Sequence, residues 1–351
     1  GTSGGEFAVQ ASTLNESLTP DNIAVRRETT VGSADETAVR VGNAVLYVQR
    51  VRRKLFEIAY APEADAFVSP EMTILARHLV RGGIRHIAFQ QEPWSILWAC
   101  LDDGNLVGLT YLKEQQVIGW HRHVIGGTNV KVLSLTTIPG DGYDELWLVV
   151  ERTIGGAAKR YVERMAPEFW PDSESDKSGC FFVDGGLSYS GPPATLISGL
   201  DHLKGETVQI LADGASHPDK TVDDLGRITL DRPASAVQVG LGYESRLETL
   251  DLEAGAAEGT AQGRRKRIHE VAVKLWATLG ARIGFSGSVL DEISFREGAM
   301  RMDVSPPLFT GDKILAFPKG WDREARVTVV QGQPFPCTIL AIMPRLTTND
   351  T

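Results

Sequence analysis

Short apolar runs separated by polar or glycine-containing turns recur about every 50 residues in the first half of the chain. Three of these runs carry a leucine followed directly by an aromatic residue: Leu46-Tyr47, Leu97-Trp98 and Leu146-Trp147. After each turn a second run carries a tyrosine: Tyr60, Tyr111 and Tyr161. Two such runs joined by a short turn are typical of a β-hairpin. The pattern therefore predicts three hairpins in series.

Another extended run precedes each predicted hairpin, at residues 23–32, 84–90 and 130–138. One more, at 117–125, follows the second hairpin. Groups of three or four strands at this period are typical of β-propeller blades. A single blade cannot bury both faces of its sheet, so neighbouring blades must stack. We therefore expect Tyr47, Trp98 and Trp147 to pack between adjacent blades. The alternative is that the three aromatic pairs fall at this spacing by chance.

Residues 69–83 interrupt the strand pattern. Ser69 is suited to cap a helix, Pro70 to occupy its first turn and Gly82-Gly83 to end it. In a helix, four residues would share one face: Ile74, Leu75, His78 and Leu79. The segment therefore predicts a short helix between the first two hairpins.

The spacing changes after residue 170. A polar connection at 171–179 leads into shorter alternating runs with turns at Asp213-Gly214 and Leu225-Gly226, which are typical of a small antiparallel β-barrel. A Gly/Ala-rich loop at 253–267 ends in a basic run, and strand-like runs then return. We expect a mainly β fold with three regions: propeller-like blades at 1–180, a small β-barrel at 181–252 and a return to propeller-like sheet at 253–351.

Composition sets limits on the class of protein. The chain has 351 residues and is 42% hydrophobic and 23% charged, which suggests two domains with ample material for a core. Its net charge of −9 gives no reason to expect tight binding to nucleic acid or to an anionic membrane. No apolar run approaches the ~18 residues of a membrane helix. The chain opens on strand-like residues without an initiator methionine, so we expect it to be part of a longer protein.

The three cysteines, Cys100, Cys180 and Cys337, are too far apart in sequence to build a disulfide framework or a metal-binding knuckle. Phosphate-binding, dinucleotide-binding and nucleophile-elbow motifs are absent from the sequence, and Ser188 and Ser190 do not form such an elbow. Neither observation points to an enzyme.

Asp102-Asp103-Gly104 is the sharpest catalytic candidate, because paired carboxylates carry out glycoside hydrolysis and bind metals. Asp-Gly is also a common hairpin turn, and the repeat demands a turn at this place. His121 and His123 project to one face of a strand, a spacing that metal sites use, but no third ligand accompanies them. We favour the turn and a strand without metal.

Two charged segments remain. Asp141, Asp144 and Glu145 are expected in a solvated loop, with calcium binding as the alternative. The densest basic run comprises Arg264, Arg265, Lys266 and Arg267. This run could contact DNA phosphates or another subunit, although a solvated strand entry is the commoner outcome.

Several stretches resemble the tail nozzle proteins of short-tailed bacteriophages, a family also called tail tubular protein B. The strongest is PWSILWACLDDGNLVGLTYLKEQQVIGWHRH at 93–123; LTPDNIAVRRETTVGS, AVLYVQR, EMTILARHL, DELWLVVER and RYVERM add to it. ATLISGLDHLKGETVQILADG and ITLDRPASAVQVGLGY are similar to the small barrel of that family, which itself resembles an insert domain of ubiquitin-activating enzymes. That second likeness concerns the fold alone.

The resemblance implies a virion protein of the phage or prophage tail, made in the bacterial cytoplasm. It implies a homo-oligomeric ring of six copies, contacts with tail proteins on the adaptor or portal side and at the distal tip, and transient passage of DNA. It brings no catalytic residue and no cofactor. Two alternatives remain: a propeller-type carbohydrate-active enzyme, and a module that binds host glycans or a receptor through the barrel loops.

Overall fold

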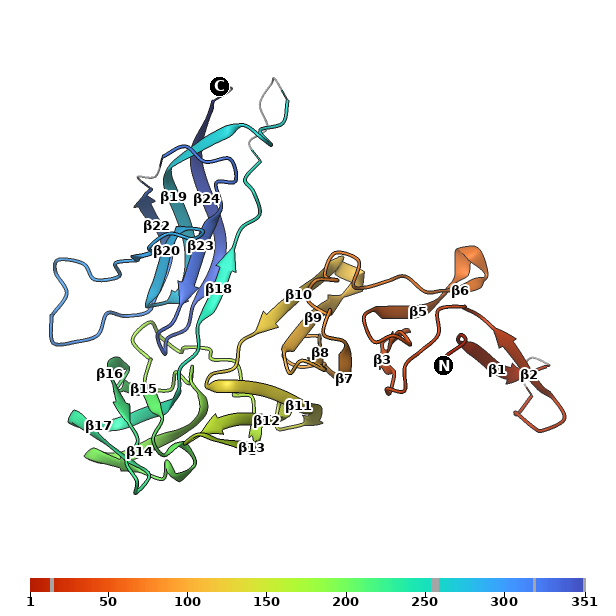
Figure 1. The fold of residues 1–351 in the computed structure, drawn as a ribbon, viewed down its shortest axis with the longest axis horizontal. Helices are drawn as coiled ribbons and strands as arrows, with labels where there is room; N and C mark the ends of the chain where they lie inside the picture. Colours follow the sequence, from red (N-terminus) through yellow and green to blue (C-terminus); the bar gives the residue numbers. More distant parts are fainter. Residues whose placement is uncertain (13–15, 254–258, 318–319, 350–351) are drawn as a thin grey trace. The chain divides into compact units, whose positions relative to one another are not determined.

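The computed structural model describes residues 1–12, 16–253, 259–317 and 320–349, whose strands form several small antiparallel sheets (Figure 1). The prediction of a mainly β chain is confirmed. Helical structure in this part of the chain amounts to three-residue 3-10 turns: η1 (Pro62–Ala64), η2 (Lys113–Gln115) and η3 (Asp201–Leu203). The chain divides into two compact units. The first holds residues 1–124, 129–152 and 158–167, and the second holds residues 125–128, 153–157 and 168–351.

The first unit is built on consecutive sheets that follow the order of the sequence. A two-stranded sheet of β1 (Phe7–Ala11) and β2 (Ile23–Arg27) comes first. Sheet A then contains β3 (Val39–Val41), β4 (Ala44–Val48), β5 (Leu55–Ala61) and β6 (Ala66–Val68). Sheet B contains β7 (Ile84–Gln90), β8 (Ile96–Leu101), β9 (Leu106–Leu112) and β10 (Val117–His123). Sheet C, most of which belongs to this unit, contains β11 (Thr128–Pro139), β12 (Asp144–Ile154) and β13 (Ala157–Arg164).

The three predicted hairpins are confirmed as β4–β5, β8–β9 and β12–β13. The first two lie in the middle of their sheets, and the third lies at one end of sheet C. The flanking runs at 84–90, 117–125 and 130–138 also form strands. The run at 23–32 does not join sheet A, because β2 pairs with β1 in the register Val9 opposite Val25. The short strand β3 takes its place beside β4.

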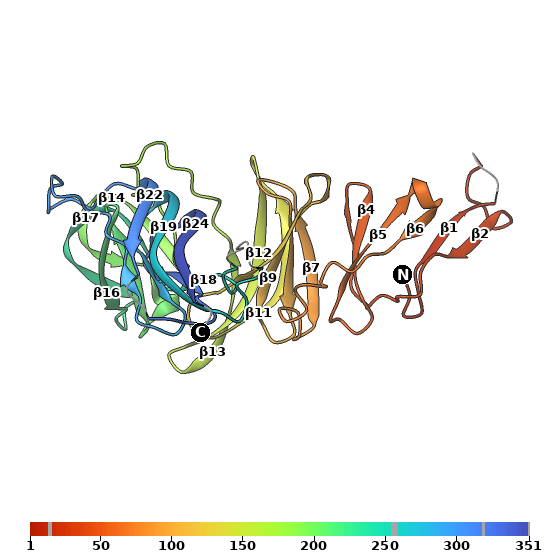
Figure 2. The same ribbon diagram turned by 90° about the horizontal axis from the view of Figure 1, so that it is seen from above.

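Equivalent backbone hydrogen bonds join sheet A to sheet B and sheet B to sheet C. The N–H of Ile84, at the start of β7, donates to the carbonyl of Arg52 in the β4–β5 turn, with N···O 2.6 Å. The N–H of Val132 in β11 donates to the carbonyl of Gly104 in the β8–β9 turn, with N···O 2.9 Å. The first strands of sheets B and C are therefore each fixed to the hairpin turn of the preceding sheet. Figure 2 shows sheets A and B as successive layers of the first unit.

Tyr47 and Trp98 lie on opposite faces of their sheets, although they align in the sequence repeat. The N–H of Gln49 donates to the Lys54 carbonyl across the hairpin. Because backbone groups alternate in direction along a strand, those of Tyr47, two residues earlier, also point toward β5. The N–H of Leu101 donates to the Asn105 carbonyl across its hairpin. Trp98 lies three residues earlier, an odd number, so its backbone groups point the other way, toward β7. The direction of a residue's backbone groups determines the face on which its side chain lies. The aligned residues of sheets A and B are therefore one position out of step in the structure.

The recurring tyrosines differ in the same way. Tyr60 is 51% exposed and hydrogen-bonds to Asp65, whereas Tyr111 is 5% exposed. Their constant distance from the preceding aromatic residue therefore does not place them in equivalent environments.

Sheets A and B bury one shared cluster of side chains. Sheet A contributes Leu46, Val48 and Leu55, and sheet B contributes Ile84, Ile87, Leu97, Ala99, Leu101, Val107, Leu109 and Tyr111. The strands of β8 and β9 are apolar on both faces and have few polar positions, as expected of a sheet covered on both sides.

The predicted helix at 69–83 is wrong. The segment forms consecutive turns closed by hydrogen bonds between residues three apart: Ala76 to Thr73, Leu79 to Ala76 and Gly83 to Val80. The N–H of Met72 donates to the Leu55 carbonyl, and Ser69 pairs with the Tyr47 hydroxyl instead of capping a helix. These contacts tie the segment to sheet A, so Thr73, Ala76 and Val80 are buried while Ile74 and Leu75 face solvent.

The second unit contains three sheets. One has the order β14-β17-β15-β16: β14 (Asp184–Ser198), β15 (Thr207–Ala212), β16 (Ala215–Thr221) and β17 (Arg227–Leu241). The second has the order β18-β23-β20-β21: β18 (Ser245–Glu248), β20 (Ala281–Phe285), β21 (Asp291–Glu292) and β23 (Val327–Gln331). The third has the order β22-β19-β24: β19 (Arg265–Thr278), β22 (Phe309–Ala316) and β24 (Thr338–Asn349).

The first of these sheets occupies the segment expected to be a small barrel. Its two long strands, β14 and β17, pair with each other from end to end, and the last part of β17 also pairs with β15 on its other side. Register shifts interrupt the β14–β17 pairing at several places. Bulges of this kind increase the bend and twist of a strand.

The other two sheets of the second unit share a core. The alternation of β19 directs Val271, Val273 and Leu275 to one side, where they meet Ile283 of β20 and Val329 of β23 in a single buried cluster. Residues 254–258 of the predicted Gly/Ala-rich loop lie outside the described residues.

We predict that the shared core of sheets A and B is a major source of stability in the first unit. Leu97→Ala should lower the free energy of unfolding by about 2–5 kcal/mol, because Leu97 is fully buried and truncation leaves a cavity. Leu75→Ala, at a leucine that is 91% exposed, should change it by less than about 0.5 kcal/mol. Urea unfolding followed by tryptophan fluorescence measures both. Equal losses in the two variants would contradict the assignment of this core.

Candidate functional site

Asp102-Asp103-Gly104 forms the β8–β9 turn, as the repeat predicts. The N–H of Gly104 donates to the Leu101 carbonyl at 2.9 Å, and Gly104 has a φ of +92°, a conformation that strongly favours glycine. The Asp103 carboxylate accepts from the Asn105 N–H at 3.1 Å. Both aspartate side chains lie against the main chain of Gly82 and Gly83. The two carboxylates thus close a turn and pack on the neighbouring loop.

Trp98, His121 and His123 form an aromatic cluster on one face of sheet B. Gly108 lies between Trp98 and His121 in the cross-strand register, and a side chain at Gly108 would overlap the His121 ring. The ring centroids of Trp98 and His123 are 4.6 Å apart. The Trp98 indole N–H donates to Gln90 at 2.8 Å, which satisfies its polar atom.

The histidine pair is held by hydrogen bonds within the protein. Nδ1 of His121 lies 2.7 Å from Nε2 of His123, and Nε2 of His121 lies 3.2 Å from the Thr110 hydroxyl. Burial lowers the pKa of His121; burial, and then the charge of His121, lowers the pKa of His123 to about 3. The described residues contain no group of three or more His, Cys, Asp or Glu side chains arranged to hold a metal ion. A metal at this pair would have to displace their mutual hydrogen bond.

Glu57 is a buried charge that connects sheets A and B. Its carboxylate, on β5, accepts a hydrogen bond from the Tyr111 hydroxyl of β9 at 2.9 Å and pairs with the Lys113 ammonium of η2. Burial, and then the hydrogen bond to this carboxylate, raises the pKa of Tyr111. Sequence reasoning missed Glu57. The available signal was a single acidic residue inside the apolar run LFEIAYA.

Asp144 connects sheets B and C. Its Oδ2 atom accepts the N–H groups of Gln91 and Glu92 at 2.7 and 3.1 Å, and the Gln90 side chain donates to its backbone carbonyl at 2.8 Å. The neighbouring Glu145 pairs with Arg164 and accepts the indole N–H of the half-buried Trp147 at 3.0 Å. Protein donors therefore occupy carboxylate oxygens that the calcium alternative would need.

The basic run at 264–267 is divided by strand alternation. Arg265 and Arg267 are exposed on β19, whereas Lys266 is 1% exposed and its ammonium donates to the Arg323 carbonyl at 2.8 Å. A contact surface here would consist of arginines without Lys266. Sequence reasoning overlooked the charge of the run at 50–54, RVRRK, which has four basic residues in five and lies in the β4–β5 turn.

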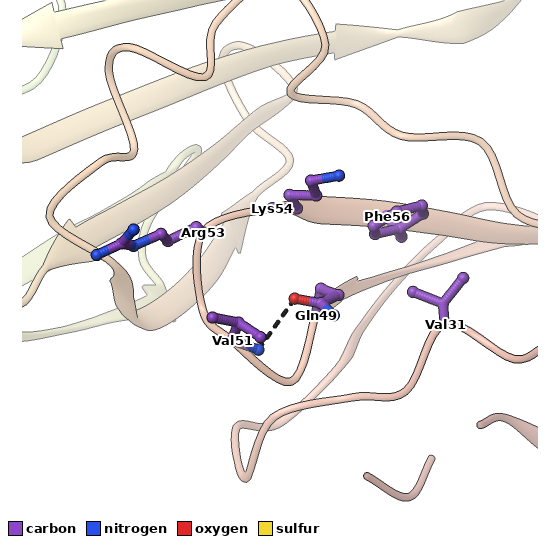
Figure 3. Close-up of a pocket in the computed structure, with 6 residues that line it drawn as sticks. All are labelled: Val31, Gln49, Val51, Arg53, Lys54 and Phe56. Atoms are coloured by element: carbon purple, nitrogen blue, oxygen red, sulfur yellow. Dashed lines mark hydrogen bonds between the residues drawn. The ribbon is translucent and has the colours of Figure 1, made fainter. Parts of the chain in front are cut away.

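Two of the shallow pockets among the described residues have polar and charged side chains in their lining. The first has a volume of about 430 Å³, and it is lined by Val31, Gln49, Val51, Arg53, Lys54 and Phe56 (Figure 3). The second has a volume of about 340 Å³, and it is lined by Ser216, His217, Pro218, Asp231 and Arg232.

His217, in the second pocket, is not available as a base. Its Nδ1 lies 2.7 Å from the Pro218 carbonyl, and its Nε2 accepts the Asp231 N–H at 3.0 Å. Both nitrogens thus bind backbone groups, which fixes the ring. The thiols are also unreactive: burial raises the pKa of Cys100 and Cys337 to about 11 and that of Cys180 to about 12.

A scan against protein-family models and a search of curated proteins found no match to this chain. The helices of the described residues are too short to cross a membrane.

We predict that the buried Glu57 carboxylate depends on its cation. Lys113→Ala should lower the free energy of unfolding by about 3 kcal/mol, because it leaves a buried charge without a counter-ion. Adding Glu57→Gln should restore most of the loss, since the amide is neutral and can still accept from Tyr111. Urea unfolding of the single and double variants measures this coupling, with Lys159→Ala as a control at an exposed lysine. Additive losses in the double variant would argue against the ion pair.

We predict that His123 makes the protein less stable in mild acid. Its pKa is about 3 in the folded state against 6.5 for a free side chain, so the unfolded chain binds a proton first as the pH falls. The stabilisation is complete above pH 6.5 and is lost toward pH 3, at up to about 1.4 kcal/mol per pH unit. In thermal melts between pH 7.5 and 5, the fall of the melting temperature with falling pH should be smaller in His123→Phe than in the wild type. The fall should be the same as in the wild type in His269→Gln, a change at an exposed histidine. Equal slopes would exclude His123 as the source.

Proposed function

We propose that this chain is a structural component of a bacteriophage or prophage tail, part of the nozzle platform through which DNA leaves the capsid. The sequence resemblance at 93–123 points to this class. The structural observation that carries the proposal is the repeated link between sheets, Arg52 to Ile84 and Gly104 to Val132. A conduit must keep its shape during DNA passage, and sheets joined at the same place in series suit that task.

In this proposal sheets A, B and C are blades of a β-propeller, and β14 to β17 form a small barrel. The buried connections at Glu57 and Asp144 would limit sliding of one blade on the next. The protein acts as a non-enzymatic building block in a ring of six copies, in contact with neighbouring tail proteins. The net charge of −9 suits a conduit, because few phosphate contacts would hold the moving DNA.

A second candidate is a module that binds glycans on the host surface. The observation in its favour is the shallow polar pocket at Ser216, Asp231 and Arg232, which lies where barrel loops were expected to form a contact surface. Polar and charged groups around a shallow depression are compatible with a sugar ligand.

We predict that the protein is part of the virion. Gold-labelled antibodies against the chain should bind the tails of purified virions induced from the strain that carries this sequence. The proposal would be overturned if the antibodies bound the purified protein from the cytoplasm but bound neither intact nor disrupted virions. Cleavage of host polysaccharide by the purified chain, lost in Asp103→Asn, would instead favour a carbohydrate-active enzyme.

A further inference from the structure

The first pocket lies on the face of sheet A that carries Tyr47. Gln49 directly follows β4, and Phe56 lies on β5, opposite Tyr47 in the register, while Val31 reaches the pocket from the segment before β3. The two aromatic rings stack with centroids 6.0 Å apart. The core shared with sheet B is formed by the other face, which carries Leu46 and Leu55. The pocket therefore lies on the face of sheet A opposite the core that it shares with sheet B.

The turn beside the pocket is held in one conformation. The N–H of Val51 donates to the side-chain oxygen of Gln49 at 2.9 Å, as Figure 3 shows, and the N–H of Arg52 donates to the Gln49 carbonyl at 2.6 Å. Val51 is nevertheless 59% exposed. An exposed aliphatic side chain on a fixed turn is a surface prepared for contact, because binding costs little ordering entropy.

The charge around the pocket is strongly positive. Arg50, Arg52, Arg53 and Lys54 occur within five residues, and Arg53 is exposed. The Lys54 ammonium lies 3.2 Å from Glu71, but Glu71 also accepts two hydrogen bonds from Arg77, at 2.8 and 2.6 Å. The local acidic group is thus shared between two cations, which leaves an excess of positive charge at the turn.

We propose that this pocket binds an acidic segment of a partner protein that carries an aliphatic or aromatic side chain between its carboxylates. The apolar side chain covers Val31, Val51 and Phe56, and a flanking carboxylate pairs with Arg53. A DNA backbone fits less well, because it offers phosphates to the cations but nothing apolar to cover three hydrophobic side chains. The site stands apart from the proposed role in a tail: it predicts peptide binding whether or not the chain belongs to a virion.

Fluorescence anisotropy with the whole chain tests this site. One probe is a labelled pool of octapeptides that alternate Asp or Glu with Leu, Val, Ile or Phe. The matched pool carries Asn or Gln in place of the acidic residues. We expect the acidic pool to bind at least about tenfold more tightly, with an affinity that falls as salt is added. Equal affinity for the two pools would overturn the proposal.

Two variants locate the binding. Arg53→Glu should weaken binding of the acidic pool by about fivefold or more, because one ion pair is replaced by a repulsion. Arg265→Glu, at an exposed arginine of the second unit, should leave it unchanged. Val51→Ser should weaken binding of both pools, and it keeps the test valid if Arg53→Glu is unstable. An equal effect of Arg53→Glu and Arg265→Glu, or tighter binding of a duplex DNA oligonucleotide that Arg53→Glu abolishes, would refute the assignment.

Discussion

The need to cover both faces of each small sheet is the constraint on which the first unit depends. Sheet B illustrates it: Leu97 and Leu101 point toward the core shared with sheet A, while Trp98 points to the other face. Four short strands cannot bury enough surface alone, so each sheet needs neighbours. The backbone bonds from Arg52 and Gly104 to the next sheet set the spacing at which this covering occurs. The side chains between the sheets follow from that arrangement.

Burial between layers explains why Glu57, Asp144 and the two histidines of sheet B have hydrogen-bond partners. The Glu57 carboxylate has Tyr111 and Lys113, the Asp144 carboxylate has two backbone N–H groups, and the histidines bind each other. A buried polar group without a partner costs more than its hydrogen bond contributes. Residues that looked chemically active in the sequence therefore serve, in the structure, as connections between strands and sheets.

Surface charge shows how tertiary position changes the meaning of a basic run. The runs at 50–54 and 264–267 each hold four basic residues, but the second lies partly in a strand, where alternation buries Lys266. The first lies at a turn, where alternation does not apply and Arg53 stays exposed beside an apolar depression. The contrast follows from backbone geometry, which assigns every second strand residue to one face.

The sequence by itself determined the strand content, the three hairpins and the Asp102–Gly104 turn, because alternation and turn residues are local signals. It did not determine the face of each aromatic residue, since a one-residue offset between Tyr47 and Trp98 is invisible in spacing alone. Nor did it determine the turns at 69–83. There, helix signals gave way to hydrogen bonds with sheet A that only the folded chain provides. The pairing of Glu57 with Tyr111 and Lys113 also required the tertiary structure, because it brings together residues more than 50 positions apart.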